Sequence, residues 1–239
     1  MAIRAPATAP FGAGVRVSSI IIALADLEPR TTQYTFWKRV TDIVASAALL
    51  AAVSPILSAT AIAVKLTSSG PILYRQKRIG EYGEEFEMLK FRSMFVNSSS
   101  KAHEDAIIAY MAGKKLSEDP NSKSPYKLTN DPRITRVGRF IRKTSIDELP
   151  QLWNVLRGDM SLVGPRPPLP YEVDRYSVRA MERLKGKPGI TGPWQVYGRN
   201  RVTFDEMVEM DIAYLRVRSL WNDLKLIALT PTAAVSGGE

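Results

Sequence analysis

The stretch Lys143–Pro167, KTSIDELPQLWNVLRGDMSLVGPRP, places two adjacent carboxylates, Asp147 and Glu148, just after a run rich in arginine. Ser145 and Glu148 have the spacing of a capping box, so one interpretation is the start of a helix. With Asp147 as the N-cap, Pro150 becomes the third helical residue, where proline is tolerated because its missing amide hydrogen would have no partner. The local pattern therefore predicts a helix N-terminus at Asp147.

A short amphipathic helix is expected to follow this start. Its apolar positions are Leu152, Trp153, Val155 and Leu156. Gly158 is expected to end it, since glycine readily adopts a positive φ angle. A helix N-terminus carries partial positive charge, which keeps a carboxylate ionised and attracts phosphate. The stretch therefore also suits a catalytic pair, and it leaves both interpretations open.

The composition limits the chemistry that the chain can perform. Its 33 Lys and Arg residues exceed its 24 Asp and Glu residues by nine, which favours anionic partners such as phospholipids, nucleic acids or phosphorylated metabolites. Cysteine is absent, which excludes disulfides, thiolate catalysis and cysteine-bound zinc. The single histidine, His103, is interpreted as a solvated helix residue. Any metal must therefore use oxygen ligands, which favours Mg²⁺.

The sequence suggests three regions: a flexible leader over residues 1–33, a membrane anchor over 34–66 and a cytosolic catalytic domain over 67–239. Ile43 to Val64 forms a run of 22 residues without a charge. At about 1.5 Å per residue, this run is long enough to cross a hydrocarbon core about 30 Å thick. A single spanning helix is therefore one interpretation of the anchor.

Two features of the anchor favour a re-entrant hairpin instead. Basic residues flank both ends, with Lys38 and Arg39 before the run and Lys65 after it, so both ends are expected in the cytosol. Ser54 and Pro55 stand at the midpoint, where proline removes a backbone hydrogen bond and bends a helix. Two arms of about 11 residues would each reach about 16 Å into the membrane.

The remaining chain predicts an α+β, mostly helical fold: a re-entrant membrane helix-hairpin, a small β-hairpin or sheet, and amphipathic interface helices. The segments ILYRQ and FEMLKFRSM alternate apolar and polar residues around a glycine-containing turn, which is typical of a hairpin. Lys90 and Arg92 should then project on one face, with Phe91 on the other. The segments TFDEMVEMDIAYLRVR and LWNDLKLIALTPTAAV predict two amphipathic helices near the C-terminus.

A phosphate-handling site is the hypothesis that unites these features. The cations expected around phosphate are Lys90, Arg92, Arg142, Arg166 and Arg199. Asp147 can act as a nucleophile on phosphorus or as a ligand of Mg²⁺. Glu148 can hold the metal, move a proton or cap its helix.

Several segments, in order, resemble the monotopic phosphoglycosyl transferases, also called bacterial sugar transferases. From about Trp37 onward, these are KRVTDIVASAALLAAVSP, GPILYRQKRIG, LKFRSM, IRKTSIDELPQLWNVLRGDMSLVGPRP and KPGITGPWQVYGRN. One departure is the pair Pro193 and Trp194, where many relatives of this family carry Trp-Ala. The resemblance supports the re-entrant anchor broken at Ser54 and Pro55. It also suggests a shorter member, with a leader in place of a large N-terminal membrane domain.

The resemblance implies an enzyme that moves a sugar-1-phosphate from a UDP-sugar to polyprenyl (undecaprenyl) phosphate and releases UMP. It implies Asp147 as the nucleophile of a covalent intermediate, with Asp147 and Glu148 as the metal-binding pair for Mg²⁺. Phosphate and substrate binding would fall to Lys90, Arg92, Arg142, Pro165, Arg166, Pro167, Gln195 and Arg199. The expected location is the cytosolic face of the bacterial inner membrane, with membrane lipids but no nucleic acid as partners, and homo-oligomerisation is left open.

Two other functions remain open from the sequence. One is another membrane-bound phosphoryl transferase or phosphatase that uses an aspartyl phosphate. The other is a non-catalytic scaffold whose basic face binds anionic lipid or nucleic acid, which would show salt-sensitive binding without turnover.

Overall fold

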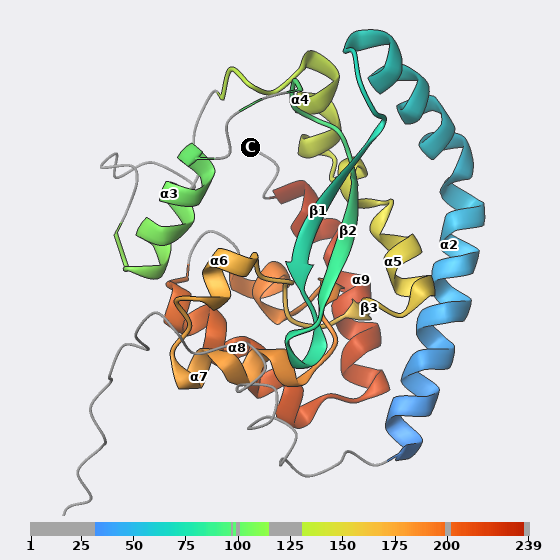
Figure 1. The fold of residues 1–239 in the computed structure, drawn as a ribbon. Helices are drawn as coiled ribbons and strands as arrows, with labels where there is room; N and C mark the ends of the chain where they lie inside the picture. Colours follow the sequence, from blue (N-terminus) through green and yellow to red (C-terminus); the bar gives the residue numbers. More distant parts are fainter. Residues whose placement is uncertain (1–31, 97, 99–100, 115–130, 199–201, 237–239) are drawn as a thin grey trace, which may run out of the picture.

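The computed structural model describes residues 32–96, 98, 101–114, 131–198 and 202–236 (Figure 1). The described chain is mostly helical and carries two small sheets of two strands each, as the α+β prediction requires. The predicted leader, residues 1–33, lies almost wholly outside the described residues. The predicted region boundaries remain predictions.

The predicted anchor is a single helix, α2 (Thr32–Thr67), which runs along one side of the molecule (Figure 1). Pro55 lies inside it without interrupting it, so the hairpin is not confirmed. Proline removes the hydrogen bond to the carbonyl four residues earlier, at Ala51. The Ser54 hydroxyl donates to that same carbonyl at 2.9 Å, which explains how the helix continues through the proline.

One face of α2 packs on the domain and the other is exposed and apolar. Asp42, Ser46 and Val64 are buried on the packed face. Only 11% of the most apolar 18-residue stretch is buried, and among the described residues α2 is the one helix long and apolar enough to cross a membrane. A helix at the core of a soluble protein would be largely covered. Its composition and exposure therefore suit contact with lipid.

A buried polar network fixes the N-terminal part of α2 to the rest of the molecule. Lys38 bridges the carboxylates of Asp42 and Asp223 at 3.0 and 3.1 Å. Asp42 also accepts a hydrogen bond from the Leu162 amide, and Asp223 accepts one from the Tyr214 hydroxyl. Buried charges are tolerated when they are paired and hydrogen-bonded in this way. The network ties the predicted anchor to the strand and helices that surround the site.

The predicted hairpin is confirmed as strands β1 (Leu73–Ile79) and β2 (Glu85–Phe91), which pair antiparallel. A 3₁₀ turn, η1 (Glu81–Gly83), joins them. Gly83 has φ +85°, a conformation that costs glycine little. Phe91 is buried, while Lys90 points to the opposite face, as strand alternation predicts.

A second sheet was not predicted. Strand β3 (Ser161–Val163) pairs in parallel with β4 (Gly189–Thr191). The strands approach so closely that a Cβ on Gly164 would lie 2.2 Å from the Lys187 carbonyl oxygen, and one on Gly189 would lie 2.1 Å from the Gly164 nitrogen. Glycine is therefore required at both positions.

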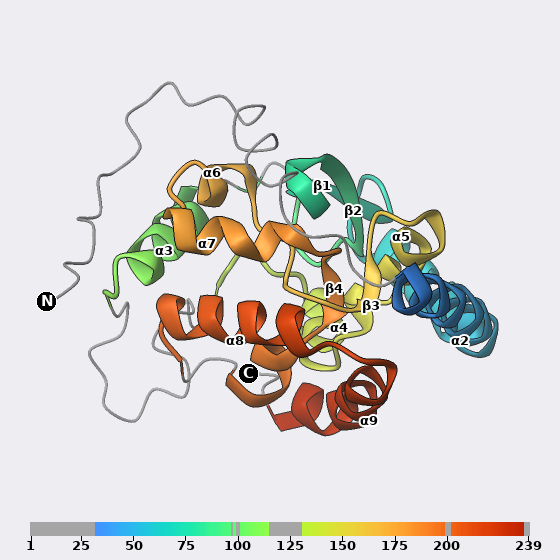
Figure 2. The same ribbon diagram turned by 90° about the horizontal axis from the view of Figure 1, so that it is seen from below.

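Helices cover the hairpin and the second sheet on several sides. Before β3 lie α3 (Lys101–Met111), α4 (Arg136–Lys143), η2 (Ile146–Glu148) and α5 (Gln151–Arg157). After it lie α6 (Pro170–Val173), α7 (Val178–Met181), η3 (Glu182–Lys185), the π-helical η4 (Trp194–Gly198), α8 (Phe204–Val217) and α9 (Leu220–Ser236). The last two confirm the predicted pair of C-terminal helices. In Figure 2, α2 is seen nearly end-on at the edge of the molecule, with α7 and α8 side by side.

The described residues form three apolar core clusters. One lies between α8 and the α7–η3 segment, and includes Met207 and Leu184. A second joins β2, α5 and β3 through Met88 and Val155. The third packs the C-terminal half of α2 against α4. The segment η2, which carries the two carboxylates, therefore lies between packed elements.

Candidate active site

The two carboxylates lie on the 3₁₀ turn η2, between α4 and α5. The prediction that Asp147 is an N-cap is wrong: α5 begins at Gln151, and its N-cap is Pro150. Ser145 makes no side-chain cap and has φ +57°, so the chain turns sharply there before it enters η2. The predicted end of the helix at Gly158 is confirmed, with φ +99°.

Asp147 is an unusual carboxylate because it is almost buried and makes no ion pair with any of the described residues. The residue is 9% exposed. Burial, followed by the neighbouring charge of Glu148, raises its pKa to about 6, although Lys90 and Arg142 act in the opposite direction. Its side chain is therefore more basic than an ordinary aspartate and still largely ionised at neutral pH.

Glu148 has the opposite character. Lys90, on β2, donates to its Oε1 atom at 2.9 Å. Burial alone would raise the pKa of Glu148, but Lys90, with smaller contributions from Arg166 and Arg78, lowers it below the usual value. Adjacent carboxyl groups whose pKa values are pushed apart often have different chemical roles.

Tertiary contacts hold Lys90 opposite the turn. Asn154 on α5 is fully buried, and its side chain pairs with the main chain of β2: its Oδ1 accepts from the Leu89 amide, and its Nδ2 donates to the Glu87 carbonyl. The helix that follows the carboxylates is thereby attached to the strand that carries Lys90.

A family model described as bacterial sugar transferase matches residues 33–237. The chain belongs to the bacterial sugar transferase family. It is 46% identical over 200 residues to the undecaprenyl-phosphate galactose phosphotransferase of Salmonella typhimurium. The matched region covers 82% of the chain and 40% of that protein. It is 44% identical over 203 residues to the UDP-glucose:undecaprenyl-phosphate glucose-1-phosphate transferase of Caulobacter vibrioides, covering 81% and 67%.

A third relative is similar in length. The exopolysaccharide production protein ExoY of Rhizobium meliloti is 38% identical over 203 residues, which covers 84% of the chain and 87% of that protein. The chain thus spans about two fifths of the Salmonella relative but most of the Rhizobium one.

The Pro165, Arg166 and Pro167 segment follows β3 and brings Arg166 near the carboxylates. The Arg166 guanidinium lies 3.4 Å from Glu172 and remains 24% exposed. Its charge is close enough to Glu148 to help lower the pKa of that group. Arg142, in the last turn of α4, is exposed, and its charge limits the rise in the pKa of Asp147. Lys90, Arg142 and Arg166 therefore gather around the pair.

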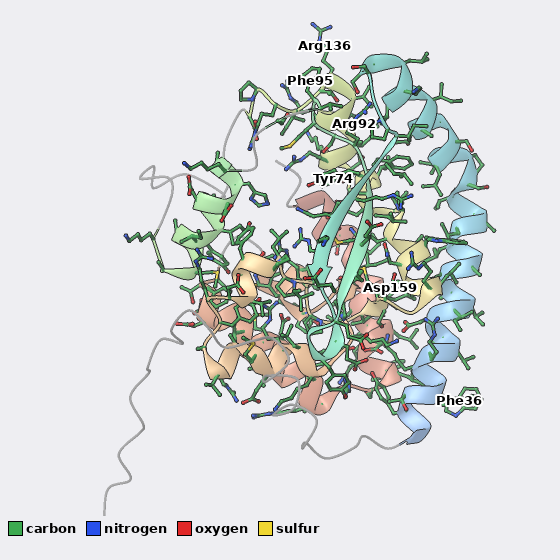
Figure 3. All side chains as sticks on the ribbon, in the orientation of Figure 1. Phe36, Tyr74, Arg92, Phe95, Arg136 and Asp159 are labelled. Carbon is green, nitrogen blue, oxygen red and sulfur yellow. The ribbon has the colours of Figure 1, made fainter. Side chains whose placement is uncertain are left out.

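Arg92 and Gln195 occupy other positions. Arg92 is buried, and its Nη2 donates to the Ser68 carbonyl and hydroxyl at 2.8 Å, so it caps the C-terminus of α2 rather than facing Glu148 with Lys90. Figure 3 shows Arg92 near that end of α2. Gln195 lies in η4, where its buried Oε1 has no hydrogen-bond partner among the described residues. Arg199 lies outside the described residues.

The sequence did not identify two further groups near the site. Arg78, on β1, is 4% exposed, and burial, followed by the charge of Arg166, lowers its pKa to about 10. His103, on α3, was expected to be solvated, and the residue does keep an exposed surface. Desolvation by the surrounding protein, with Arg166 and Arg78, nevertheless lowers its pKa to about 4, so the imidazole is neutral at pH 7.

The carboxylate pair fits a metal ion only in combination with substrate. Among the described residues, no group of three or more metal-binding side chains occurs. Asp147 and Glu148 offer hard oxygen donors, which suit Mg²⁺, an ion that proteins commonly hold with one or two carboxylates plus substrate phosphates. The donor set therefore fits Mg²⁺ bound together with a phosphate-containing substrate.

Proposed function

We propose that this chain transfers a sugar-1-phosphate from a UDP-sugar to undecaprenyl phosphate and releases UMP, as the first step of glycoconjugate or exopolysaccharide assembly. The names of the Salmonella and Caulobacter relatives support the reaction class. The observation that carries the proposal is the pair of adjacent carboxyl groups: Asp147 has a raised pKa and no ion pair among the described residues, and Glu148 is fixed by Lys90.

In the first half-reaction, an oxygen of Asp147 attacks the phosphorus that bears the sugar. The bond from that phosphorus to the bridging oxygen of the diphosphate breaks, and UMP leaves with that oxygen. A sugar phosphate is then esterified to Asp147. With a pKa of about 6, roughly nine tenths of the Asp147 side chains are ionised at pH 7. The group combines availability with more basicity than an ordinary aspartate, which favours attack.

In the second half-reaction, a phosphate oxygen of undecaprenyl phosphate attacks the same phosphorus and Asp147 leaves as a carboxylate. The UDP-sugar and undecaprenyl phosphate enter the site in separate half-reactions, so the two anionic substrates do not repel each other there. Arg166 and Arg142 offset negative charge around phosphorus, and Lys90 holds Glu148 in place. Mg²⁺, when bound by Asp147 and Glu148, would neutralise phosphate charge.

We propose further that α2 anchors the enzyme monotopically at the inner membrane, with both ends in the cytosol. The basic residues at both ends support cytosolic ends, and the exposed apolar face supports contact with lipid; Pro55 is the position at which such a helix would bend within the membrane. Undecaprenyl phosphate keeps its charge at the headgroup level, so the sugar phosphate on Asp147 that it attacks must stand at that level. Because α2 packs along α4 and α5, it can set the height of η2 between them.

The decisive experiment measures UMP release from a panel of UDP-sugars with undecaprenyl phosphate, for the wild type and Asp147→Asn. Without lipid, the wild type should gain the mass of one sugar phosphate on Asp147 and release one equivalent of UMP. The matched control is Asp174→Asn, which changes an exposed carboxylate outside the site. An active Asp147→Asn enzyme, or an adduct mapped to another residue, would overturn the assignment. Lipid binding without any turnover would favour the scaffold alternative.

A further inference from the structure

The four residues Pro165–Pro168, called here the arginine arm, are anchored through every main-chain carbonyl. Each carbonyl accepts a hydrogen bond from another part of the chain. The donor–acceptor pairs are the Gly189 amide to Pro165 at 2.8 Å, Arg183 Nη2 to Arg166 at 3.3 Å, Arg78 Nη1 to Pro167 at 2.8 Å, and the Ile79 amide to Pro168 at 3.0 Å. The donors come from β1, η3 and β4, so three elements hold one short segment.

The composition of the arm makes these carbonyls its main anchoring points. Three of its four residues are proline, which has no amide hydrogen to donate and has φ fixed near −65°. The arm therefore cannot be stabilised by a strand ladder in which each residue both donates and accepts. Its position depends on donors supplied from outside, and two of these are arginine side chains.

Arg183 is the more deeply buried of the two arginines. It is 2% exposed, its Nε donates to Asp211 at 2.8 Å, and its Nη1 donates to the Tyr176 hydroxyl at 2.7 Å. Asp211 is completely buried. Replacing a buried ion pair with apolar residues is often neutral or stabilising, so stability alone is a weak reason for this pair. Arg183 Nη2 lies 2.7 Å from the Asp211 carboxylate and also donates to the Arg166 carbonyl at 3.3 Å, and this second contact is the one that reaches the arm.

Arg78 and Glu172 complete the support of the arm. Arg78 donates to the Pro167 carbonyl and to the side chain of Gln76. Glu172, 2% exposed, accepts from the Leu169 amide at 3.1 Å and lies 3.4 Å from the Arg166 guanidinium. Arg78 and Arg183 are too deeply buried to meet a substrate, whereas a quarter of the Arg166 side chain is exposed. The arrangement uses two buried arginines to present a third.

We propose that Arg183, held by Asp211 and Tyr176, is a positioning residue that fixes Arg166 for phosphoryl transfer, with Arg78 acting on the next carbonyl. The inference rests on the proposed function. A cation stabilises developing charge most effectively when it is held in place before the reaction, and a displacement of about 1 Å can cost about a hundredfold in rate. Four anchored carbonyls hold the Arg166 backbone in the required position.

The test is a double-mutant cycle between Arg183→Lys and Arg166→Ala, read as UMP release. Lysine keeps the positive charge beside Asp211 but lacks the planar fork that bonds Asp211, Tyr176 and the Arg166 carbonyl together. In the wild-type background, Arg183→Lys should lower kcat at least tenfold while KM changes less than threefold. In the Arg166→Ala background, it should have less than a twofold effect, because the residue through which it acts is gone.

The matched control is Arg179→Lys. Arg179 also links this region to α8, through Glu209 at 2.6 Å, but it is more exposed and does not contact the arm. It should change kcat less than twofold in both backgrounds. Hydrogen exchange provides a readout independent of activity. The amides of Leu169 and Gly189 should exchange faster in Arg183→Lys than in the wild type, and their exchange rates should be unchanged in Arg179→Lys.

The possible results separate the two proposals. If the wild type releases UMP but Arg183→Lys lowers kcat by the same factor in both backgrounds, Arg183 is only structural and the inference is overturned. Unchanged exchange at Leu169 and Gly189 would overturn it as well, even if Arg183→Lys proved too unstable to assay. A folded wild type that turns over no UDP-sugar would overturn the proposed function instead.

Discussion

Asp147→Asn is expected to abolish turnover and at the same time to stabilise the protein at neutral pH. Burial raises the pKa of Asp147 from about 4 to about 6, which means that the ionised form is less stable in the folded state than in the unfolded chain. A difference of about two pKa units corresponds to about 3 kcal/mol. Asparagine has nearly the same shape and no charge, so it should remove most of this cost.

The sign of the effect depends on pH. The unfolded carboxyl group ionises near pH 4 and the folded one near pH 6, so the unfolded state gains relative stability as the pH rises through this interval. Below pH 4, Asp147 is protonated in both states, and the substitution should change the free energy of unfolding little. Above pH 6, the full stabilisation by asparagine should be present.

The assay is denaturant unfolding of the detergent-solubilised protein, followed by tryptophan fluorescence at pH 4 and pH 7.5, alongside UMP release. The increase in the free energy of unfolding that Asp147→Asn causes should be larger at pH 7.5 than at pH 4 by about 1 kcal/mol or more. Asp174→Asn should give no such difference. An equal increase in stability at both pH values, or a decrease at pH 7.5, would refute the reasoning that burial destabilises the ionised form of Asp147. If Asp147→Asn is more stable than the wild type and also inactive, the Asp147 carboxylate serves catalysis and not stability.

Three further predictions concern Lys90, the metal ion and the orientation of α2. Lys90→Met should move the acidic limb of kcat/KM upward from about pH 6, because the Lys90 charge lowers the pKa of Asp147 and its loss removes that effect; Lys77→Met, on the same hairpin but paired with Glu85, should leave the limb unmoved. Excess EDTA should stop UMP release and Mg²⁺ should restore it, whereas full activity in EDTA would exclude an essential metal. Cysteines introduced near residues 36 and 68 should both react from the cytosolic side, and labelling from opposite sides would establish a spanning helix.

Local patterns in the sequence were enough to predict the elements that form from nearby residues. The β1–β2 hairpin, α8 and α9 each follow from the spacing of apolar residues. The parallel pairing of β3 with β4 could not be predicted, because each strand has only three residues and the pairing depends on close contact between distant glycines. For α2, the sequence left a continuous helix and a hairpin as alternatives, because a Ser-Pro pair often breaks a helix; in the structure the Ser54 hydroxyl binds the carbonyl that proline leaves free.

The candidate site was predictable in part, for a related reason. Asp147, Glu148, Lys90 and Arg166 belong to recognisable motifs, although the helix expected at Asp147 begins later. Arg183 had no such signal, because a buried arginine looks in sequence like any surface arginine. Its role depends on Asp211, 28 residues further along the chain, and on a carbonyl 17 residues earlier. Contacts of this range are visible only in the folded chain.

The structure also changes the meaning of the chain's positive charge. A formal charge of +9 could indicate a basic scaffold for nucleic acid or lipid. Several arginines, however, bind main-chain carbonyls within the protein: Arg39 at the end of α5, Arg92 at the end of α2, and Arg78 and Arg183 at the arginine arm. Lys90 is paired with Glu148, and Arg166 faces Glu172. Arginines that bind carbonyls within the protein are not available to a diffuse surface for anions. Their arrangement favours an enzyme with a defined site for an anionic substrate over the scaffold.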